Sequence, residues 1–489
     1  MIHPIMFKLA IFIRADGLTI DPFACKHLRS YLRNGIVITT KKMFELSDGF
    51  KAAVNNGIKI TQLIVIGQEA SIINSGINEN GNAVFVKDIK SCIRYLSQNH
   101  SSREWWVIGD NQFAYDLIMK GLIMDVHISK SRGSFRSFSW NEYEPYTIHQ
   151  EELFNKSILE RSEMEFSMIS QTDIYENKTI KHFMRRNREE CNLLTAMNEI
   201  ITHGFKRPNR TGVSTRSLFG KQFEYRMTER IDPVTGRSSF RLPLLTTKKM
   251  FVRGVFGELK WFLNGSTDSK ILESDGINIW KGNSSRQFLD TNDKKGYAEG
   301  ECGPIYGFQW RHWNAEWKAN KTDYTGEGID QVAQVVKSLQ EDPYSRRHII
   351  SGWNVKDLDQ MVLPPCHVLY QFLVHETDNQ KYLTLMMTQR SCDVFLGLPF
   401  NICSLGLFLL MMSHRVGMKP YKIIHSISDF HLYETHIEQA SIQTTREPCM
   451  FPYVQLNCDP KENLEDYEFK DIVISDYYSH DRITADMVA

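Results

Sequence analysis

Residues 389–412 read QRSCDVFLGLPFNICSLGLFLLMM. The uncharged part of this stretch, Val394–Met412, is long enough to span a membrane as a helix. It contains Pro399, Asn401 and Ser404, however, and it has no basic flank of the kind that orients membrane helices. We therefore interpret it as a loop that leads into a buried core helix, and we disfavour the alternative of a membrane segment.

The composition indicates a folded, globular protein. A chain of 489 residues has room for roughly two to four domains. Hydrophobic residues make up 42% and charged residues 24%, which excludes a disordered or fibrous chain. Lys and Arg (58) balance Asp and Glu (58), which argues against a protein that binds nucleic acid over a large surface but leaves a local anion site open.

The cysteines and the N-terminus bear on location. The nine cysteines include no CxxC pair, which excludes a zinc ribbon and a dithiol redox motif. The apolar run at the N-terminus is too short for a secretory signal. We expect a reduced protein in the cytoplasm.

The sequence pattern of residues 1–178 predicts one α/β unit. Short β-branched or aromatic runs between turn residues indicate strands. Helical patterns such as Lys87–Ser97 lie between them, and this alternation predicts a largely parallel sheet. The expected strands are Phe7–Ile13, Ile36–Thr39, Gln62–Ile66, Ala83–Val86, Trp105–Ile108 and Asp125–Ser129.

A polar, basic segment, Glu176–Arg188, is typical of a junction. It precedes an amphipathic helix expected over Glu189–His203 and closed by Gly204. A second helix is expected over Ile329–Gln340. Its apolar stripe consists of Ile329, Val332, Val336 and Leu339.

Four arginines of the second half have suggestive neighbours. Arg210 precedes a Thr-Gly turn whose backbone can approach a ligand, and Arg390 precedes the hydroxyl of Ser391. Together with Arg346 and Arg347, they could form a site for a phosphate monoester. Taken singly, each is better explained as an ordinary surface or paired arginine.

Cys366 lies in LPPCHVLYQF. A lone cysteine is most often a small buried apolar residue. Here two prolines stiffen the approach and His367 follows, which suits a nucleophile on a rigid mount. Such a thiol needs a nearby positive charge to lower its pKa, and the arginines could supply it.

Two further groups could read a ligand. Asn401 opens an apolar helix, where an asparagine usually caps the helix, but its carboxamide could instead read the edge of a heterocycle. His431 and Tyr433 are two residues apart and share a face if the segment is extended. The alternative for that pair is a hydrogen-bonded core histidine and tyrosine.

From about Arg188 to Ala489 these motifs resemble thymidylate synthase, a methyltransferase with an α+β fold. The blocks that carry the resemblance stand in the same order along the chain. They are NRTGVST, LPLLTTKKMF, GELKWFLNGST, GPIYGFQWRHW, DPYSRRHIISGWN, LPPCH, QRSCDVFLGLPFN and SDFHLYETHIEQ.

The resemblance implies reductive methylation of dUMP to dTMP. Cys366 would form a covalent bond to C6 of the pyrimidine, and the co-substrate 5,10-methylenetetrahydrofolate would leave as dihydrofolate. Glu258 and Tyr306 would assist the proton transfers, and Arg390 and Asn401 would support catalysis. Asn401 would favour uracil over cytosine. The family needs neither a metal nor a nicotinamide for this step.

The resemblance also assigns binding residues. One subunit would bind dUMP through Arg210, Gln389, Arg390, Ser391, Asn401, His431 and Tyr433. Arg346 and Arg347 would reach the phosphate across a homodimer interface, and Trp280, Asn283 and Asp393 would face the folate.

The second half departs from the family pattern at several positions, which bear on turnover and on closure of the site. They are Asn209, Lys281, Thr388, Ser428, His480-Asp481 and the C-terminal residues 486–489.

The first half resembles the dihydrofolate reductase domain of bifunctional dihydrofolate reductase–thymidylate synthases. Residues 1–178 would form that domain, 179–188 the junction and 189–489 the synthase domain. Thr40, Phe44 and Asp110 replace residues expected at the cofactor site, and Pro22–Met43 contains no acid to protonate the pterin. We therefore expect a degenerate domain without NADPH binding or reductase activity.

Three functions stay open. The first is an active homodimeric synthase with a degenerate first domain, for which a separate dihydrofolate reductase could recycle the product. The second is a fully bifunctional enzyme, in which Asp21 would have to replace the missing acid. The third is a non-catalytic regulatory paralogue.

Overall fold

The computed structural model describes two compact units, residues 1–186 with 230–238, and residues 187–229 with 239–489. In the first unit it describes eight strands between residues 7 and 185. From residue 187 it describes the chain through residue 488, apart from residues 233 and 234. The expected helix Lys87–Ser97 lies outside the described residues, as do Asp21, Phe44 and Asp110.

The first unit contains an eight-stranded sheet in the order β4-β3-β2-β5-β1-β6-β8-β7. The pairs among β1 to β6 are parallel, whereas β8 is antiparallel to β6 and β7. The expected strands and the largely parallel sheet are thereby confirmed. The bounds are β1 Phe7–Ile13, β2 Ile36–Thr40, β3 Gln62–Ile66, β4 Ala83–Val86, β5 Trp105–Ile108, β6 Ile123–Ser131, β7 Phe166–Tyr175 and β8 Lys178–Arg185.

Strand β8 occupies most of the segment that we expected to be a junction. It pairs with β6 and β7 along its length. The basic residues of the segment concealed Thr179, Ile180 and Phe183, which favour a strand.

The second unit is built on a six-stranded sheet in the order β13-β14-β15-β16-β10-β9. Only the pair β15–β16 is parallel among the pairings described for it. A smaller sheet has the order β11-β12-β17-β18. The bounds are β9 Phe205–Arg207, β10 Thr215–Arg226, β11 Glu229–Ile231, β12 Ser238–Arg241, β13 Ile349–Ser351, β14 His367–Thr377, β15 Gln380–Asp393, β16 Lys419–Tyr433, β17 Tyr453–Leu456 and β18 Ile472–Ser475.

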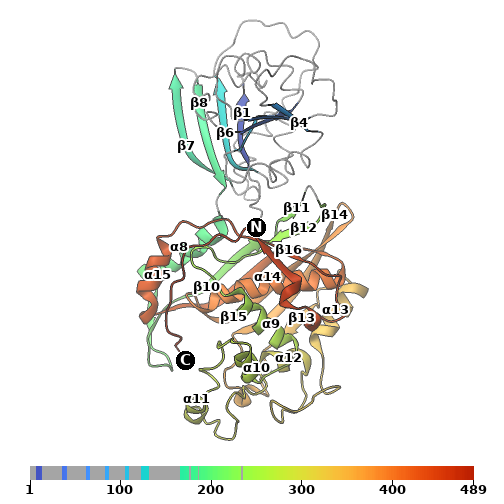
Figure 1. Ribbon diagram of the computed structural model, residues 1–489. Coiled ribbons are helices and arrows are strands. Elements are labelled where there is room, and N and C mark those ends of the chain that lie inside the picture. Colours follow the sequence, from blue (N-terminus) through green and yellow to red (C-terminus); the bar gives the residue numbers. More distant parts are fainter. Residues whose placement is uncertain are drawn as a thin grey trace. The chain divides into compact units, whose positions relative to one another are not determined.

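Helices cover the six-stranded sheet. Helix α14 contacts β15 and β16, and α9 and α13 contact α14 (Figure 1). The helical bounds are α8 Arg188–His203, α9 Val252–Leu263, α10 Ser269–Ser274, α11 Arg286–Thr291, α12 Tyr306–Arg311, α13 Gln331–Glu341, α14 Gly397–Val416 and α15 Ile437–Thr444. Short 3-10 turns are η3 Leu358–Gln360, η4 Glu434–His436, η5 Leu464–Asp466 and η6 Phe469–Asp471.

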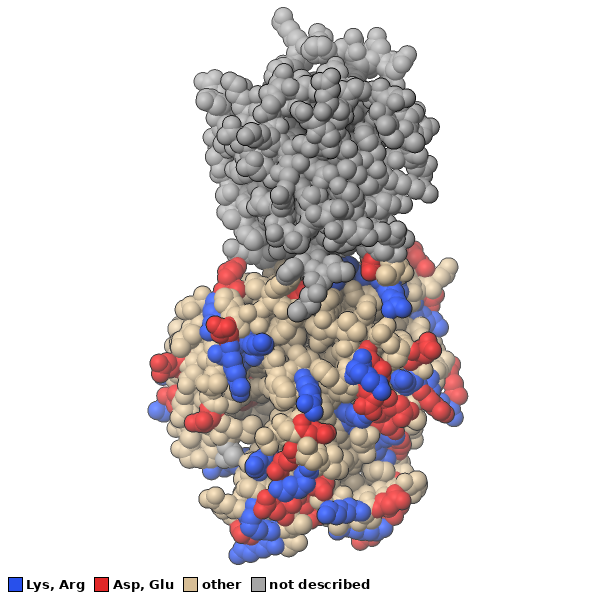
Figure 2. Space-filling view, in the orientation of Figure 1, with Lys and Arg blue, Asp and Glu red and all other residues tan. Residues whose placement is uncertain are grey.

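Helix α14 confirms our interpretation of the apolar stretch as a loop and a core helix. It is the one helix of the described residues that is long and apolar enough to cross a membrane, and 72% of its apolar window is buried inside the protein. Its neighbours are the apolar faces of the sheet and of α9, so the core of the second unit lies on both sides of α14. On the face drawn in Figure 2, acidic and basic side chains are interspersed over this unit.

The two helices predicted in this half exist with adjusted ends. Helix α8 begins one residue earlier than expected, after the N-cap Asn187, whose side chain accepts a bond from the Glu190 amide. Helix α13 begins at Gln331, so Ile329 lies outside it. Ile329 pairs instead with Trp313 and is 41% exposed, and Val335 takes its place in the buried stripe.

Candidate active site

Cys366 lies between Pro365 and the first residue of β14, and it is partly buried. Arg390 on β15 holds this position. Its backbone amide donates to the Cys366 carbonyl (2.9 Å), and Nη2 lies 3.9 Å from Sγ. The same guanidinium donates from Nε to the Pro365 carbonyl (2.9 Å) and from Nη2 to that of Pro364 (2.8 Å). The proline turn and the arginine therefore fix each other.

The pKa of the Cys366 thiol is raised, whereas we expected from the sequence that nearby arginines would lower it. Burial raises the pKa of Cys366, because the thiolate loses contact with water. The Arg390 charge opposes this shift most strongly, followed by the Tyr306 hydroxyl and the Arg210 charge. A positive charge is thus present, as the sequence suggested, but desolvation outweighs it.

Tyr306 opens α12 and lies directly beside the cysteine. Its hydroxyl accepts a hydrogen bond from the Cys366 amide (2.7 Å). The ring packs on Phe262, with centroids 4.7 Å apart, and on Trp280 at 5.9 Å. Burial raises the pKa of Tyr306 far above its usual range, so the hydroxyl stays protonated at neutral pH.

A buried polar network anchors α12. Gln309 donates to Oδ2 of Asp357 (2.8 Å) and to the Pro304 carbonyl (2.9 Å). Asn354 donates to both Gln309 (3.1 Å) and Asp357 (3.0 Å). This network lies one helical turn beyond Tyr306 and sets the direction of the helix.

Glu258 on α9 meets Trp280. The indole Nε1 donates to Oε1 of the carboxylate (2.8 Å). Burial raises the pKa of Glu258 to about 7, which the indole bond only partly opposes. This acid can therefore hold or release a proton near neutral pH. Asn283 is buried in the turn after Trp280, without a side-chain bond that links it to Cys366.

Asn401 is the fifth residue of α14, inside the helix rather than at its N-cap, which is Leu396. Its Oδ1 accepts from Nε2 of Gln389 (3.1 Å), and it also bonds His367. Burial lowers the pKa of His367 to about 4, and the Tyr370 hydroxyl lies 2.8 Å from its Nδ1. These contacts hold the carboxamide among neutral groups.

His431, Tyr433 and Asp393 meet where β15 and β16 end. Asp393 is opposite His431 in the parallel pairing, and the Val394 amide donates to the His431 carbonyl (2.9 Å). The His431 and Tyr433 rings are 5.4 Å apart, which confirms that they share a face. Oδ1 of Asp393 also accepts from the Phe395 amide (3.0 Å), which shapes the turn into α14.

The four arginines separate into two pairs. Arg210 influences the Cys366 thiol together with Arg390, and it is exposed, with its guanidinium 5.9 Å from the Phe288 ring. Arg346 and Arg347 are also exposed, and within the described residues neither guanidinium has a hydrogen bond or an ion pair. A single chain does not join this second pair to Cys366 by any contact that the structure describes.

Two groups at the site escaped the sequence analysis. His425 is fully buried on β16, and its Nε2 lies 2.7 Å from Oε1 of Gln389. Asp429 lies 3.8 Å from Nδ1 of His431 and pairs with Arg207 (3.4 Å). The alternation of buried residues along β16 was a signal for His425, because a histidine on the core face requires a partner.

The departure at Asn209 leaves its turn intact. Its Oδ1 accepts from the amide (2.8 Å) and the hydroxyl (2.6 Å) of Thr211, which an aspartate would do equally. Thr388 faces Leu369 and Ser426 on neighbouring strands, and Lys281 is exposed.

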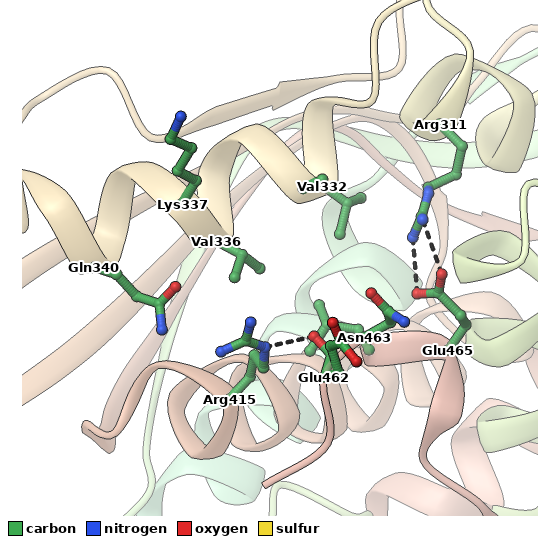
Figure 3. Close-up of a pocket in the computed structure, with 11 residues that line it drawn as sticks. Arg311, Val332, Val336, Lys337, Gln340, Arg415, Glu462, Asn463 and Glu465 are labelled. Carbon is green, nitrogen blue, oxygen red and sulfur yellow. Dashed lines mark hydrogen bonds and ion pairs between the residues drawn. The ribbon is translucent and has the colours of Figure 1, made fainter. Parts of the chain in front are cut away.

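A separate cavity lies away from this site. Figure 3 shows Val332 and Val336 of α13 pointing into it, with Arg415 and Gln340 at its border. It shares no residue with the surroundings of Cys366. Among the described side chains, no group of three or more His, Cys, Asp or Glu could hold a metal ion.

Comparison with known proteins places this geometry in a family. The family model "Thymidylate synthase" matches residues 192–489. The thymidylate synthase of Saccharomyces cerevisiae is 43% identical over 307 residues, which cover 62% of this chain and 98% of the yeast protein.

Bifunctional proteins are also similar. The bifunctional dihydrofolate reductase-thymidylate synthase of Paramecium tetraurelia is 32% identical over 453 residues, or 93% of this chain and 90% of that protein. That of Plasmodium chabaudi is 40% identical over 316 residues, or 65% of this chain and 51% of that protein. The match of the family model to most of the chain, with the cysteine, tyrosine and arginine assembled around one turn, leads to one conclusion: the chain belongs to the thymidylate synthase family.

Proposed function

We propose that this chain converts dUMP to dTMP with 5,10-methylenetetrahydrofolate and releases dihydrofolate. The observation that carries the proposal is the contact of Cys366 with both Arg390 and Tyr306 in a partly buried turn. A thiol on a rigid mount, with a cation and a protonated hydroxyl beside it, suits addition to an electron-poor ring.

The side chains divide the chemistry between them. The Cys366 thiolate adds to C6 of the pyrimidine, which moves negative charge onto a ring oxygen. Asn401 forms hydrogen bonds with the polar edge of the ring. Glu258, with its pKa of about 7, donates and accepts protons near that oxygen. The Tyr306 hydroxyl lies against the cysteine, and we assign it to removal of the proton that C5 must lose.

The nucleotide's phosphate and sugar need separate residues. Arg210 and Arg390 supply positive charge near Cys366, and Gln389 and Ser391 belong to the same strand. His431 and Tyr433 share a face that suits a ribose hydroxyl. We assign Arg210, Arg390, Ser391, His431 and Tyr433 to dUMP binding on the strength of that arrangement.

The folate supplies the one-carbon unit and the hydride that complete the methyl group. Trp280 is placed for this co-substrate because it packs on Tyr306 and bonds Glu258. Asp393 lies at the end of the strand that carries Arg390, and Asn283 follows Trp280 by less than one turn. These three residues would form the folate side of the site, and the family needs no metal for the reaction.

We further propose a homodimer through the six-stranded sheet. Along β14, Tyr370, Phe372 and Val374 are buried, whereas Leu373 between them is 51% exposed. Met386 and Ile424, which are paired on adjacent strands, are only partly covered. A second copy on this face would cover the apolar residues, and the exposed Arg346 and Arg347 would reach the nucleotide phosphate bound in that copy.

For the first domain, we propose a reductase-like fold without reductase activity, which continues past the expected boundary at residue 178 through strand β8. The sheet order of the first unit is compatible with a nucleotide-binding α/β fold. The absence of any acid in Pro22–Met43 argues against protonation of a pterin. A separate reductase would then recycle the dihydrofolate, and we propose a cytoplasmic location for both proteins.

A fully bifunctional enzyme is the second candidate, because the similarity to the Paramecium protein extends over 93% of the chain. Quenching of protein fluorescence by NADPH separates the two proposals. We expect no saturable quenching at micromolar NADPH. Saturable binding together with NADPH-dependent reduction of dihydrofolate would establish the bifunctional enzyme.

The decisive test of the synthase is release of tritium from C5-labelled dUMP in the presence of methylenetetrahydrofolate. We expect release by the purified chain and none by Cys366→Ala, which should still bind dUMP. A folded wild-type protein that releases no tritium would instead point to a regulatory paralogue.

A further inference from the structure

Behind Asn401 lies a buried line of hydrogen bonds that spans two strands and a helix. His425 is fully buried on β16, and Gln389 on β15 is only 2% exposed. Nε2 of His425 lies 2.7 Å from Oε1 of Gln389. Nε2 of Gln389 in turn donates to the Ser391 carbonyl (2.9 Å) and to Oδ1 of Asn401 (3.1 Å).

One backbone group decides which atom donates and which accepts at each of these hydrogen bonds. The Ser391 carbonyl can only accept, so the Gln389 atom that faces it must be the NH2 group. Oε1 of Gln389 then faces His425, whose Nε2 must be the donor. Burial lowers the pKa of His425 to about 3, so the ring is neutral and carries its single proton on Nε2.

We propose that Gln389 and His425 are positioning residues that fix the orientation of the Asn401 carboxamide and thereby make the site select uracil over cytosine. This inference rests on the proposed function, because it concerns the base that the synthase site reads. It differs from our assignment of Gln389 to direct substrate contact, since the amide of Gln389 is already used by Ser391, Asn401 and His425.

The two bases require opposite orientations of the amide. Uracil presents a donor at N3 and an acceptor at O4, whereas cytosine presents an acceptor at N3 and a donor at N4. To read cytosine, Asn401 would have to exchange its oxygen and nitrogen, which would set its NH2 against the NH2 of Gln389. Turning Gln389 as well would set its oxygen against the Ser391 carbonyl. Either arrangement leaves buried polar groups unpaired, which weakens binding by about tenfold or more.

The test compares dUMP and dCMP dissociation constants of the full chain by calorimetry. Gln389→Leu removes the donor to Asn401, and His425→Phe removes the donor to Gln389. We expect each to lower the preference for dUMP by about tenfold. His425→Gln should restore the preference, because its NH2 can donate to Oε1 of Gln389, although phenylalanine fills the volume of the imidazole better.

The matched control is Ile427→Val on the same strand. Ile427 is 1% exposed and pairs with Gln389, but its side chain takes no part in the hydrogen-bond line. We expect this variant to lose stability and to keep the wild-type preference. The comparison separates loss of packing from loss of amide orientation.

Failure of the inference is distinguishable from failure of the proposed function. A wild type that releases tritium, with an unchanged preference in Gln389→Leu and His425→Phe, would overturn the positioning role. A wild type without tritium release would overturn the proposed function. The ratio of the dUMP and dCMP dissociation constants would still show whether the orientation of Asn401 selects the base. If His425→Phe does not fold, Gln389→Leu decides: an unchanged ratio refutes the positioning role and a lowered ratio supports it.

Discussion

Arg390 holds Cys366 at two points: its backbone amide bonds the Cys366 carbonyl at 2.9 Å, and its Nη2 lies 3.9 Å from Sγ. The guanidinium also bonds the carbonyls of Pro364 and Pro365, so it cannot turn away from the thiol without losing both bonds. One residue thereby sets both the position of the nucleophile and the electric field at it.

Replacement of Arg390 should make the thiol less reactive. Burial raises the pKa of Cys366 and the Arg390 charge opposes it, so Arg390→Gln should raise that pKa further and reduce the thiolate fraction. We expect slower alkylation of Cys366 by iodoacetamide at pH 8, followed by mass spectrometry of the Cys366 peptide. Arg311→Gln, which loses a pair with Glu465 remote from the thiol, is the control. Equal alkylation rates in wild type and Arg390→Gln would show that the Arg390 charge does not lower the pKa of Cys366.

Arg346 should act across the proposed dimer. Arg346→Ala alone is expected to lose nucleotide affinity, because the substrate phosphate loses a cation. Mixing it with Cys366→Ala should restore activity, since a heterodimer contains one site with both an intact cysteine and an intact partner arginine. Tritium release after mixing and exchange measures this rescue. No activity above that of the two separate variants would show that each site uses arginines of its own chain.

Glu258 should make stability depend on pH. Its folded pKa is raised to about 7 from the ordinary glutamate value of 4.5. A raised folded pKa stabilises the fold at low pH, and this contribution is lost as the pH rises from about 4.5 through 7. Glu258→Gln is neutral throughout, so it should be more stable than wild type above pH 7, by up to about 3 kcal/mol, with no such gain below pH 4.5. Urea denaturation of both proteins at pH 4.5 and 8 provides the comparison, and a pH-independent difference would show that Glu258 titrates normally.

Glu190 should be a stability residue. The carboxylate is fully buried and accepts from the amides and hydroxyls of Thr246 and Thr247 and from Asn187. Glu190→Gln sets an NH2 group against these donors, which should cost about 3 kcal/mol of unfolding free energy.

The control for Glu190 lies on the same helix. Glu199 pairs with Lys221 at a partly exposed site, so the same substitution there should change stability by at most about 0.5 kcal/mol. Urea denaturation measures both variants. Equal effects would show that the threonines rearrange to accommodate the amide.

The sequence by itself determined the strands of the first unit and the core helix α14, and it singled out Cys366, Tyr306 and Arg390, which the fold brings together. These features depend on local composition and on ordered motifs, which are visible without coordinates. The sequence predicted poorly where tertiary pairing overrode local character. Strand β8 has a basic sequence, yet it pairs with strands on both sides. Ile329 is not part of the buried face of α13, because it pairs with Trp313.

Only the tertiary structure decided the electrostatics and the supports of the site. The sequence suggested a lowered pKa for Cys366 from the arginines, but the balance depends on how deeply the thiol is buried, and desolvation prevails. Nothing in the sequence links His425 to Gln389. The parallel pairing of β15 and β16 brings their side chains into contact. Burial and cross-strand contacts join residues that are distant in sequence, so only the folded chain determines them.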